Sequence, residues 1–96
     1  MSYVNLKMDI RYTISGRVQG VGFRYYTCQQ AQHLALNGYV RNLADGRVEA
    51  YAQGSEENLQ VFRELLNEGP VGARVKEVTY QILSVKNDSD GFRVRY

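Results

Sequence analysis

The chain contains 96 residues, of which 44% are hydrophobic and 23% are charged, and this size and composition predict one globular domain over residues 1–96. Its net charge of +2 is too small to indicate a nucleic acid or another polyanion as partner, and no apolar run approaches the roughly 18–20 residues of a membrane helix. Because Cys28 is the only cysteine, the sequence excludes an internal disulfide, argues against a Cys/His zinc site and favours a reducing compartment, the cytoplasm.

Alternating apolar and polar residues predict a first strand from Met8 to Ser15. The glycine-rich segment 16–22 interrupts this alternation and predicts a loop. The spacing then becomes helical, and the predicted buried face of this first helix consists of Phe23, Thr27, Ala31, Leu34 and Ala35. Asn37 and Gly38 predict the end of the helix, because both residues tolerate the left-handed backbone conformation.

Two further strands are predicted from Tyr39 to Leu43 and from Arg47 to Gln53, joined by a hairpin turn at Asp45-Gly46. Ser55 is the predicted N-cap of a second helix, which Gly69-Pro70 ends. The buried stripe of that helix is predicted to consist of Leu59, Phe62, Leu65 and Leu66.

A fourth strand is predicted from Arg74 to Val85, followed by a polar loop from Lys86 to Asp90 and a short last strand from Phe92 to Tyr96. On the fourth strand, the residues expected to share one face are Val78, Tyr80 and Ile82.

The order of these elements is β-α-β-β-α-β with an additional strand at the end. Two helices cannot cover both faces of such a sheet, so we expect an α+β sandwich of the ferredoxin-like kind, with both helices on one face of an antiparallel sheet. The opposite face should be exposed and polar, as indicated by Arg11, Thr13, Glu49 and Tyr51. This fold carries enzymes, metal carriers, regulatory modules and RNA binders, and therefore does not decide the function.

The loop of residues 16–22, with Phe23 and Arg24 behind it, is the segment best suited to bind an anion. At the start of a helix the backbone N–H groups have no partner within the helix, and the helix dipole favours a negative charge. Glycines allow successive N–H groups to converge on one group of oxygen atoms, and the Arg24 guanidinium matches a phosphate with two hydrogen bonds. The simpler interpretation, in which the glycines only make a tight turn and Arg24 is solvated, remains open on spacing alone.

Asn42 is the second candidate, because strand residues two apart share a face and Asn42 would then point to the same side as an apolar Val40. An amide at such a position needs a hydrogen-bond partner. That partner is either the backbone or a water molecule held over the loop, which the amide can orient.

Other reactive side chains favour ordinary roles. Cys28 is expected to pack at the edge of the core, because no histidine and basic pair is placed to activate its thiol. His33 is expected to be a solvated surface residue, and Tyr25 and Tyr26 to pack at the core and its boundary.

Taken together, residues 16–24 (GRVQGVGFR), 38–42 (GYVRN) and 45–49 (DGRVE) closely resemble the motifs of the acylphosphatase family, and the resemblance extends over essentially the whole chain. It is weakest over residues 1–7, which we expect to be mobile. Gly22 stands where some members of the family carry a bulkier residue.

The resemblance implies a ferredoxin-like enzyme that hydrolyses the carboxyl–phosphate bond of acylphosphates without metal or cofactor. It implies that Asn42 positions the attacking water and that the Arg24 side chain binds the phosphate. The backbone that it implies as the phosphate cradle is that of Gln19, Gly20, Val21, Gly22, Phe23 and Arg24. Inorganic phosphate is then the product and a competitive inhibitor, and we expect a cytoplasmic monomer that binds neither nucleic acid nor membrane.

Two other functions fit the fold less well. An RNA-binding sheet needs stacking aromatic residues within a basic and glycine-containing motif on its third strand, which residues 47–52 lack. A phosphate-binding regulatory module without turnover would keep Arg24 and lose Asn42, whereas this sequence has both.

Overall fold

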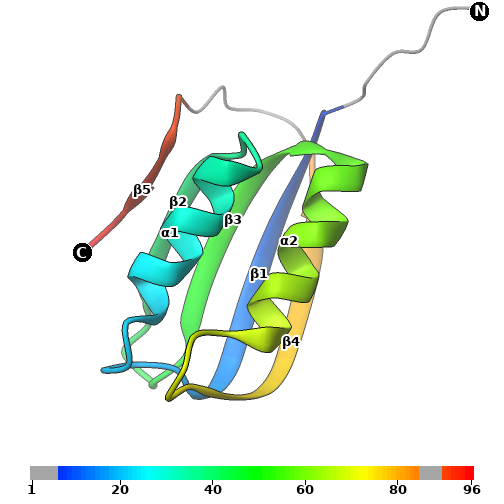
Figure 1. Ribbon diagram of the computed structural model, residues 1–96. Coiled ribbons are helices and arrows are strands. Elements are labelled where there is room, and N and C mark those ends of the chain that lie inside the picture. Colours follow the sequence, from blue (N-terminus) through cyan, green and yellow to red (C-terminus); the bar gives the residue numbers. More distant parts are fainter. Residues whose placement is uncertain (1–6, 85–89) are drawn as a thin grey trace, which may run out of the picture.

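The computed structural model describes residues 7–84 and 90–96 as a sheet with two helices (Figure 1). The elements in chain order are β1 (Lys7–Arg17), α1 (Phe23–His33), β2 (Asn37–Asn42), β3 (Val48–Ser55), α2 (Glu56–Glu68), β4 (Arg74–Leu83) and β5 (Phe92–Val94). Within these residues, neither helix has the length and apolar character needed to cross a membrane. The element order predicted from the sequence is therefore confirmed.

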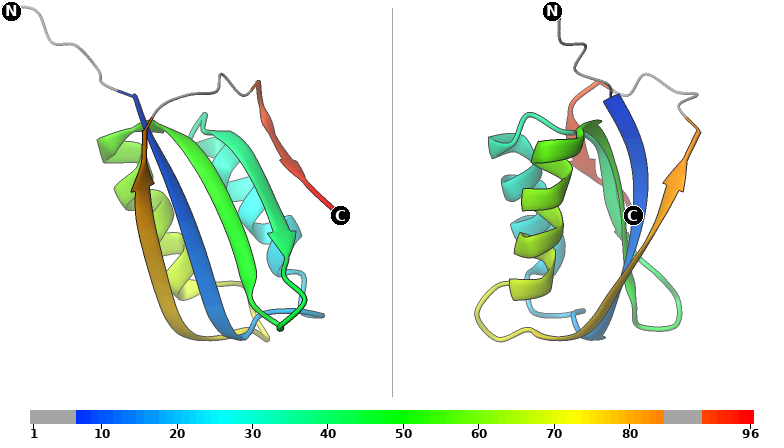
Figure 2. Two further views of the ribbon diagram at one scale, coloured as in Figure 1. Left: turned by 180° about the vertical axis from the view of Figure 1, so that it is seen from behind. Right: turned by 90° about the vertical axis from the view of Figure 1, so that its right-hand side faces the viewer.

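The five strands lie in the order β4-β1-β3-β2-β5, and both helices pack on the same face of the sheet (Figure 2). This arrangement confirms the predicted ferredoxin-like α+β fold. The prediction of a wholly antiparallel sheet is wrong in one place, because β5 pairs with β2 in parallel, with Gly38 opposite Phe92. Strands β2 and β5 both run antiparallel to β4. Because β5 lies beside β2, at the edge of the sheet opposite β4, the two strands pair in parallel.

One apolar core fills the space between the sheet and the helices. Its buried side chains are Ile10, Tyr12, Ile14, Val18, Phe23, Ala31, Leu36, Val40, Val48, Ala50, Ala52, Leu59, Phe62, Leu66 and Phe92. Across the core, the Tyr12 hydroxyl donates a hydrogen bond to the Leu59 carbonyl oxygen at 3.1 Å, which fixes α2 against β1. The apolar side chains that alternate along β1 and β3 thus form the buried face of the sheet, as predicted from the sequence.

The helix ends are determined by local backbone chemistry. The Ser55 hydroxyl accepts a hydrogen bond from the Asn58 N–H at 3.2 Å, which confirms the predicted N-cap of α2. Helix α1 ends at His33, before Leu34 and Ala35, which were predicted to lie on its buried face. Ala35 is exposed and has a left-handed backbone, and Leu36 enters the core instead.

Strand β1 extends two residues beyond its predicted end because of an irregularity in its pairing with β4. The register shifts between Ser15 and Gly16, and the strand continues to Arg17 opposite Arg74. Lys7, expected in a mobile segment, belongs to β1. The rest of that segment (residues 1–6), the predicted end of β4 at Val85 and most of the polar loop lie outside the described residues.

The sheet face opposite the helices is polar, as predicted, but it is not exposed throughout. Glu49 is only 8% exposed, because its carboxylate accepts hydrogen bonds from the Tyr39 hydroxyl and the Arg41 Nε at 3.0 and 2.8 Å. Asp9 is also buried there and accepts hydrogen bonds from Tyr51 and Gln53. Long side chains of neighbouring strands therefore cover the centre of this face.

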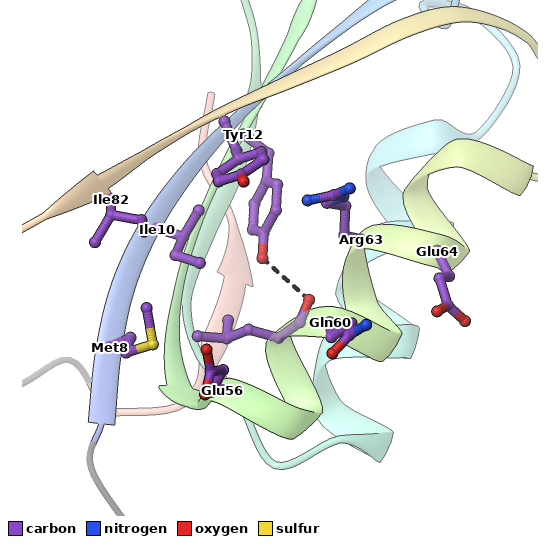
Figure 3. Close-up of a pocket in the computed structure, with 10 residues that line it drawn as sticks. Met8, Ile10, Tyr12, Glu56, Gln60, Arg63, Glu64 and Ile82 are labelled. Carbon is purple, nitrogen blue, oxygen red and sulfur yellow. Dashed lines mark hydrogen bonds between the residues drawn. The ribbon is translucent and has the colours of Figure 1, made fainter.

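At the other edge, α2 leaves part of β4 uncovered. Tyr80 and Ile82, which were predicted to share one face of this strand, are 49% and 58% exposed. Beside them lies a groove of about 210 Å³ between β1, β4 and α2 (Figure 3). In this groove the Arg63 guanidinium carbon lies 4.8 Å from the centre of the Tyr80 ring.

Candidate active site

The loop between β1 and α1, residues 18–22, is here called the cradle loop. Val18 is buried in the core and anchors the start of the loop. Gly20 and Gly22 have left-handed backbones, with φ of 75° and 78°. A Cβ atom on either residue would meet no atom within 4 Å, so the reason for glycine at these positions is backbone conformation rather than crowding.

Helix α1 begins directly behind the cradle loop. Gly22 is its N-cap and supplies no side-chain cap, while its carbonyl oxygen accepts the first helical hydrogen bond from the Tyr26 N–H at 3.0 Å. The N–H groups of the first helical turn therefore lack partners within the helix, and the positive end of the helix dipole lies at the loop. This backbone suits an anion such as phosphate.

Arg24 adds a positive charge in the first turn of α1. Its guanidinium carbon lies 4.8 Å from the centre of the Tyr96 ring. Stacking of this kind covers one face of the guanidinium and leaves its in-plane N–H groups available. No carboxylate in the described part of the chain pairs with Arg24, so these donors are available to an anionic ligand.

Asn42 is the last residue of β2, and the hairpin turn that follows lies at the same end of the molecule as the cradle loop (Figure 1). Its amide oxygen is buried and receives no hydrogen bond from the described residues. A half-turn of the amide exchanges its oxygen and nitrogen, so the Asn42 side chain can either accept from a water or donate to an anion. The sequence left open whether the backbone supplies a partner for this amide, and no backbone N–H of the described residues donates to its oxygen.

Arg24, Asn42 and the cradle loop meet around one cavity of about 220 Å³. The residues that line it are Val18, Gly20, Gly22, Phe23, Arg24, Tyr25, Asn42, Val94 and Tyr96. Of the six predicted cradle residues, Gln19 and Val21 do not line this cavity. Val21 packs against the core, and the Gln19 side chain contacts the turn between β2 and β3.

Three residues of the cavity wall were not predicted from the sequence. Tyr25 was expected to pack at the core boundary, but it is 67% exposed and lines the cavity, because the helix starts here and turns this position outward. Val94 and Tyr96 arrive from the far end of the chain. No spacing signal connects them with residues 18–24, since the contact depends on β5 pairing with β2.

The other reactive side chains have the ordinary positions that were predicted. Cys28 is half-buried, its Sγ lies 3.5 Å from the Phe92 carbonyl oxygen, and burial raises the pKa of its thiol. His33 is exposed at the end of α1, and the Tyr26 hydroxyl donates to the Leu65 carbonyl oxygen at 2.8 Å. In residues 7–84 and 90–96, no three His, Cys, Asp or Glu side chains form a group that could hold a metal ion.

Comparison with known proteins identifies one family. The acylphosphatase family model matches residues 10–94. An acylphosphatase from Vibrio parahaemolyticus is 46% identical over 83 residues, which cover 86% of this chain and 91% of that protein. The solved acylphosphatase structures from Coxiella burnetii and Bacillus subtilis superpose with TM-scores of 0.88 and 0.90 at 40% and 36% identity. Each covers 93% of this chain, and the match spans 93% and 99% of those chains respectively.

Proposed function

This chain belongs to the acylphosphatase family and hydrolyses the carboxyl–phosphate bond of acylphosphates, and we propose that Arg24 and the cradle backbone hold the phosphate while Asn42 positions the attacking water. The observation that carries this proposal is the common cavity, in which an arginine, an amide and a helix N-terminus face the same space. The reaction yields a carboxylate and inorganic phosphate.

The phosphate is proposed to bind through charge-assisted hydrogen bonds. The cradle backbone of residues 19–24 supplies N–H donors to its oxygens, chiefly from Gly20, Gly22, Phe23 and Arg24, which line the cavity, and the Arg24 guanidinium supplies two parallel donors. Preorganised donors of this kind stabilise the charge that develops on the phosphoryl oxygens during bond cleavage. None of the described residues that line the cavity has a carboxylate side chain, so no acidic side chain opposes the bound anion there.

The chemical step needs little acid catalysis from the protein, because a carboxylate is already a good leaving group. Catalysis then consists mainly of positioning and charge stabilisation. Asn42 orients the water through its amide oxygen, and a phosphate oxygen of the substrate accepts the proton of the attacking water. The hydrolysis is thereby balanced without a basic side chain.

Further proposals concern the setting of the reaction. Inorganic phosphate acts as a competitive inhibitor, because product and substrate share the same phosphate contacts. The described residues are proposed to form one domain, which is supported by their single core, and to act as a monomer. The free thiol of Cys28 supports a reducing compartment, the cytoplasm.

The experiment compares Arg24→Ala with Asn42→Ala, using benzoyl phosphate hydrolysis and the binding of inorganic phosphate measured by calorimetry. Arg24→Ala should lose both turnover and phosphate binding, because its charge contacts the phosphate before and during cleavage. Asn42→Ala should lower kcat by about 10²–10³-fold or more and still bind phosphate, because its target is the water.

Matched controls come from α2, where Arg63→Ala and Asn67→Ala remove an arginine and an amide away from the cavity. Both should retain turnover and phosphate binding, and all variants are checked for folding by circular dichroism. Normal turnover by Asn42→Ala would show that the site assignment is wrong. Loss of phosphate binding in Asn42→Ala as severe as in Arg24→Ala would make Asn42 a structural brace of the cradle loop.

A further inference from the structure

The side chain of Gln19 joins the two halves of the proposed active site. Gln19 lies in the cradle loop, and its Nε2 donates hydrogen bonds to the carbonyl oxygens of Leu43 and Arg47 at 2.8 and 2.9 Å. Both acceptors belong to the turn between β2 and β3, and Leu43 directly follows Asn42. One amide therefore links the loop that faces the phosphate to the strand end that carries Asn42.

The turn is already held together by its own backbone. The Leu43 N–H donates to the Arg47 carbonyl oxygen at 2.8 Å, and the Gly46 N–H donates to the Leu43 carbonyl oxygen at 3.2 Å. A carbonyl oxygen has two lone pairs, so Gln19 takes the second acceptor position on each of these oxygens. Both N–H donors of its amide are thereby used to join the turn and the cradle loop.

Val18 and Val21 pack against the core, but the two glycines of the cradle loop, Gly20 and Gly22, have no side chains to hold it in place. A Cβ atom on either glycine would meet nothing within 4 Å, so no packing contact fixes the loop at these positions. Asn42 reaches the cavity from a different element, separated from the loop in the chain by the whole of α1. A water-positioning amide must stand at the correct distance from the phosphorus atom, and a displacement of about 1 Å can lower the rate by roughly 10²-fold.

We propose that Gln19 is a positioning residue, whose side chain sets the separation between the phosphate-binding loop and Asn42. This inference rests on the proposed function, because it acts through the role given there to Asn42. Gln19 does not touch the substrate through its side chain. Its two hydrogen bonds hold the loop against the turn, so that the water held by Asn42 lies in line with the bond that breaks.

The test is a double-mutant cycle on kcat with Gln19→Met and Asn42→Ala. Methionine has a similar length and removes both N–H donors without adding a charge. In the wild-type background Gln19→Met should lower kcat by about 10–10²-fold. In the Asn42→Ala background the same change should have little further effect on kcat, because the residue through which Gln19 acts is already absent.

A matched control is Gln32→Met on α1. Gln32 also donates from its Nε2 to a backbone carbonyl oxygen, that of Phe92 at 3.3 Å, but it does not contact the cradle loop. This variant should keep the wild-type kcat. Equal losses of kcat from Gln19→Met in both backgrounds, or no loss in either, would overturn the proposal, since a merely structural role would give additive effects.

Gln19→Glu provides a second test that does not depend on how well the methionine variant folds. An ionised carboxylate faces two carbonyl oxygens and donates to neither, whereas the protonated acid donates to one of them. The kcat of Gln19→Glu relative to wild type should therefore rise as the pH falls and the carboxylate becomes protonated. A flat ratio across the pH range would contradict the proposal. Wild-type turnover in Asn42→Ala alone would instead refute the proposed function on which it rests.

Discussion

Replacement of Gly38 by alanine should unfold the protein or nearly do so. Gly38 lies in β2 with φ of 143°, a backbone conformation that residues with a side chain rarely adopt. A Cβ atom there would overlap the carbonyl oxygen of Tyr51 and lie 2.8 Å from the carbonyl carbon of the same residue. Both neighbours are backbone atoms of the adjacent strand, so no side-chain rotation can relieve the contact.

The magnitude follows from what must move. Strands β2 and β3 would have to separate locally, which breaks hydrogen bonds in a ladder that runs from Asn37 to Asn42. Backbone strain contributes roughly 1–3 kcal/mol, and each lost hydrogen bond adds about 1 kcal/mol. About 2 kcal/mol of strain and two lost hydrogen bonds give a total of about 4 kcal/mol, which approaches the lower end of the whole stability of a small domain, about 5–15 kcal/mol.

The assay is urea unfolding followed by circular dichroism, with Gly72→Ala as the matched control. Gly72 also has a positive φ, 94°, but a Cβ atom there meets nothing within 4 Å. A left-handed backbone costs alanine roughly 1–2 kcal/mol, which the lower entropy of the unfolded chain offsets only in part, so this control should lose about 1–2 kcal/mol. Similar unfolding free energies for Gly38→Ala and Gly72→Ala would refute the argument from strand contact.

Three further outcomes are expected. Hydrolysis of benzoyl phosphate should persist in EDTA, because the proposed site meets the phosphate charge with N–H and guanidinium donors; a strict requirement for added Mg²⁺ or Zn²⁺ would contradict this. Cys28→Ser should keep its turnover and lose about 1 kcal/mol or less in urea unfolding, because the half-buried hydroxyl can donate to the Phe92 carbonyl oxygen; an inactive but folded variant would make the thiol catalytic. Burial raises the pKa of Tyr12 above its ordinary value near 10, so the free energy of unfolding should fall as the pH rises above 10. Tyr12→Phe should lower this free energy by about 1 kcal/mol at neutral pH, because it removes the hydrogen bond to Leu59, and should flatten the decline at high pH. An unchanged decline would contradict the assignment to Tyr12.

Features that depend on a few consecutive residues could be predicted from the sequence. The Ser55 cap, the glycine loop before Arg24 and the alternation of Val48, Ala50 and Ala52 each follow from local backbone chemistry or from strand periodicity. Local patterns also singled out Arg24 and Asn42, which the structure brings to one cavity, and the family motifs added the role expected of each. Their separate roles in catalysis stay predictions until the variants are measured.

Features that depend on neighbours distant in the chain could not be predicted. Glu49 was placed on an exposed face by its periodicity, but Tyr39 and Arg41 of the adjacent strand supply the donors that allow its burial. Tyr80 is uncovered because α2 leaves the edge of the sheet free, which no alternation along β4 reveals. The contact between Gln19 and Leu43 likewise requires the positions of two separate loops.

The packing of β5 against α1 gives the protein an internal reporter of local unfolding. Strand β5 lies at the edge of the described sheet, and its Phe92 carbonyl oxygen contacts the Cys28 thiol. A fluctuation that lifts β5 from β2 removes this cover and at the same time withdraws Val94 from the wall of the cavity. The rate at which a thiol reagent modifies Cys28 in the native protein therefore reports on the opening of the same wall that lines the proposed active site.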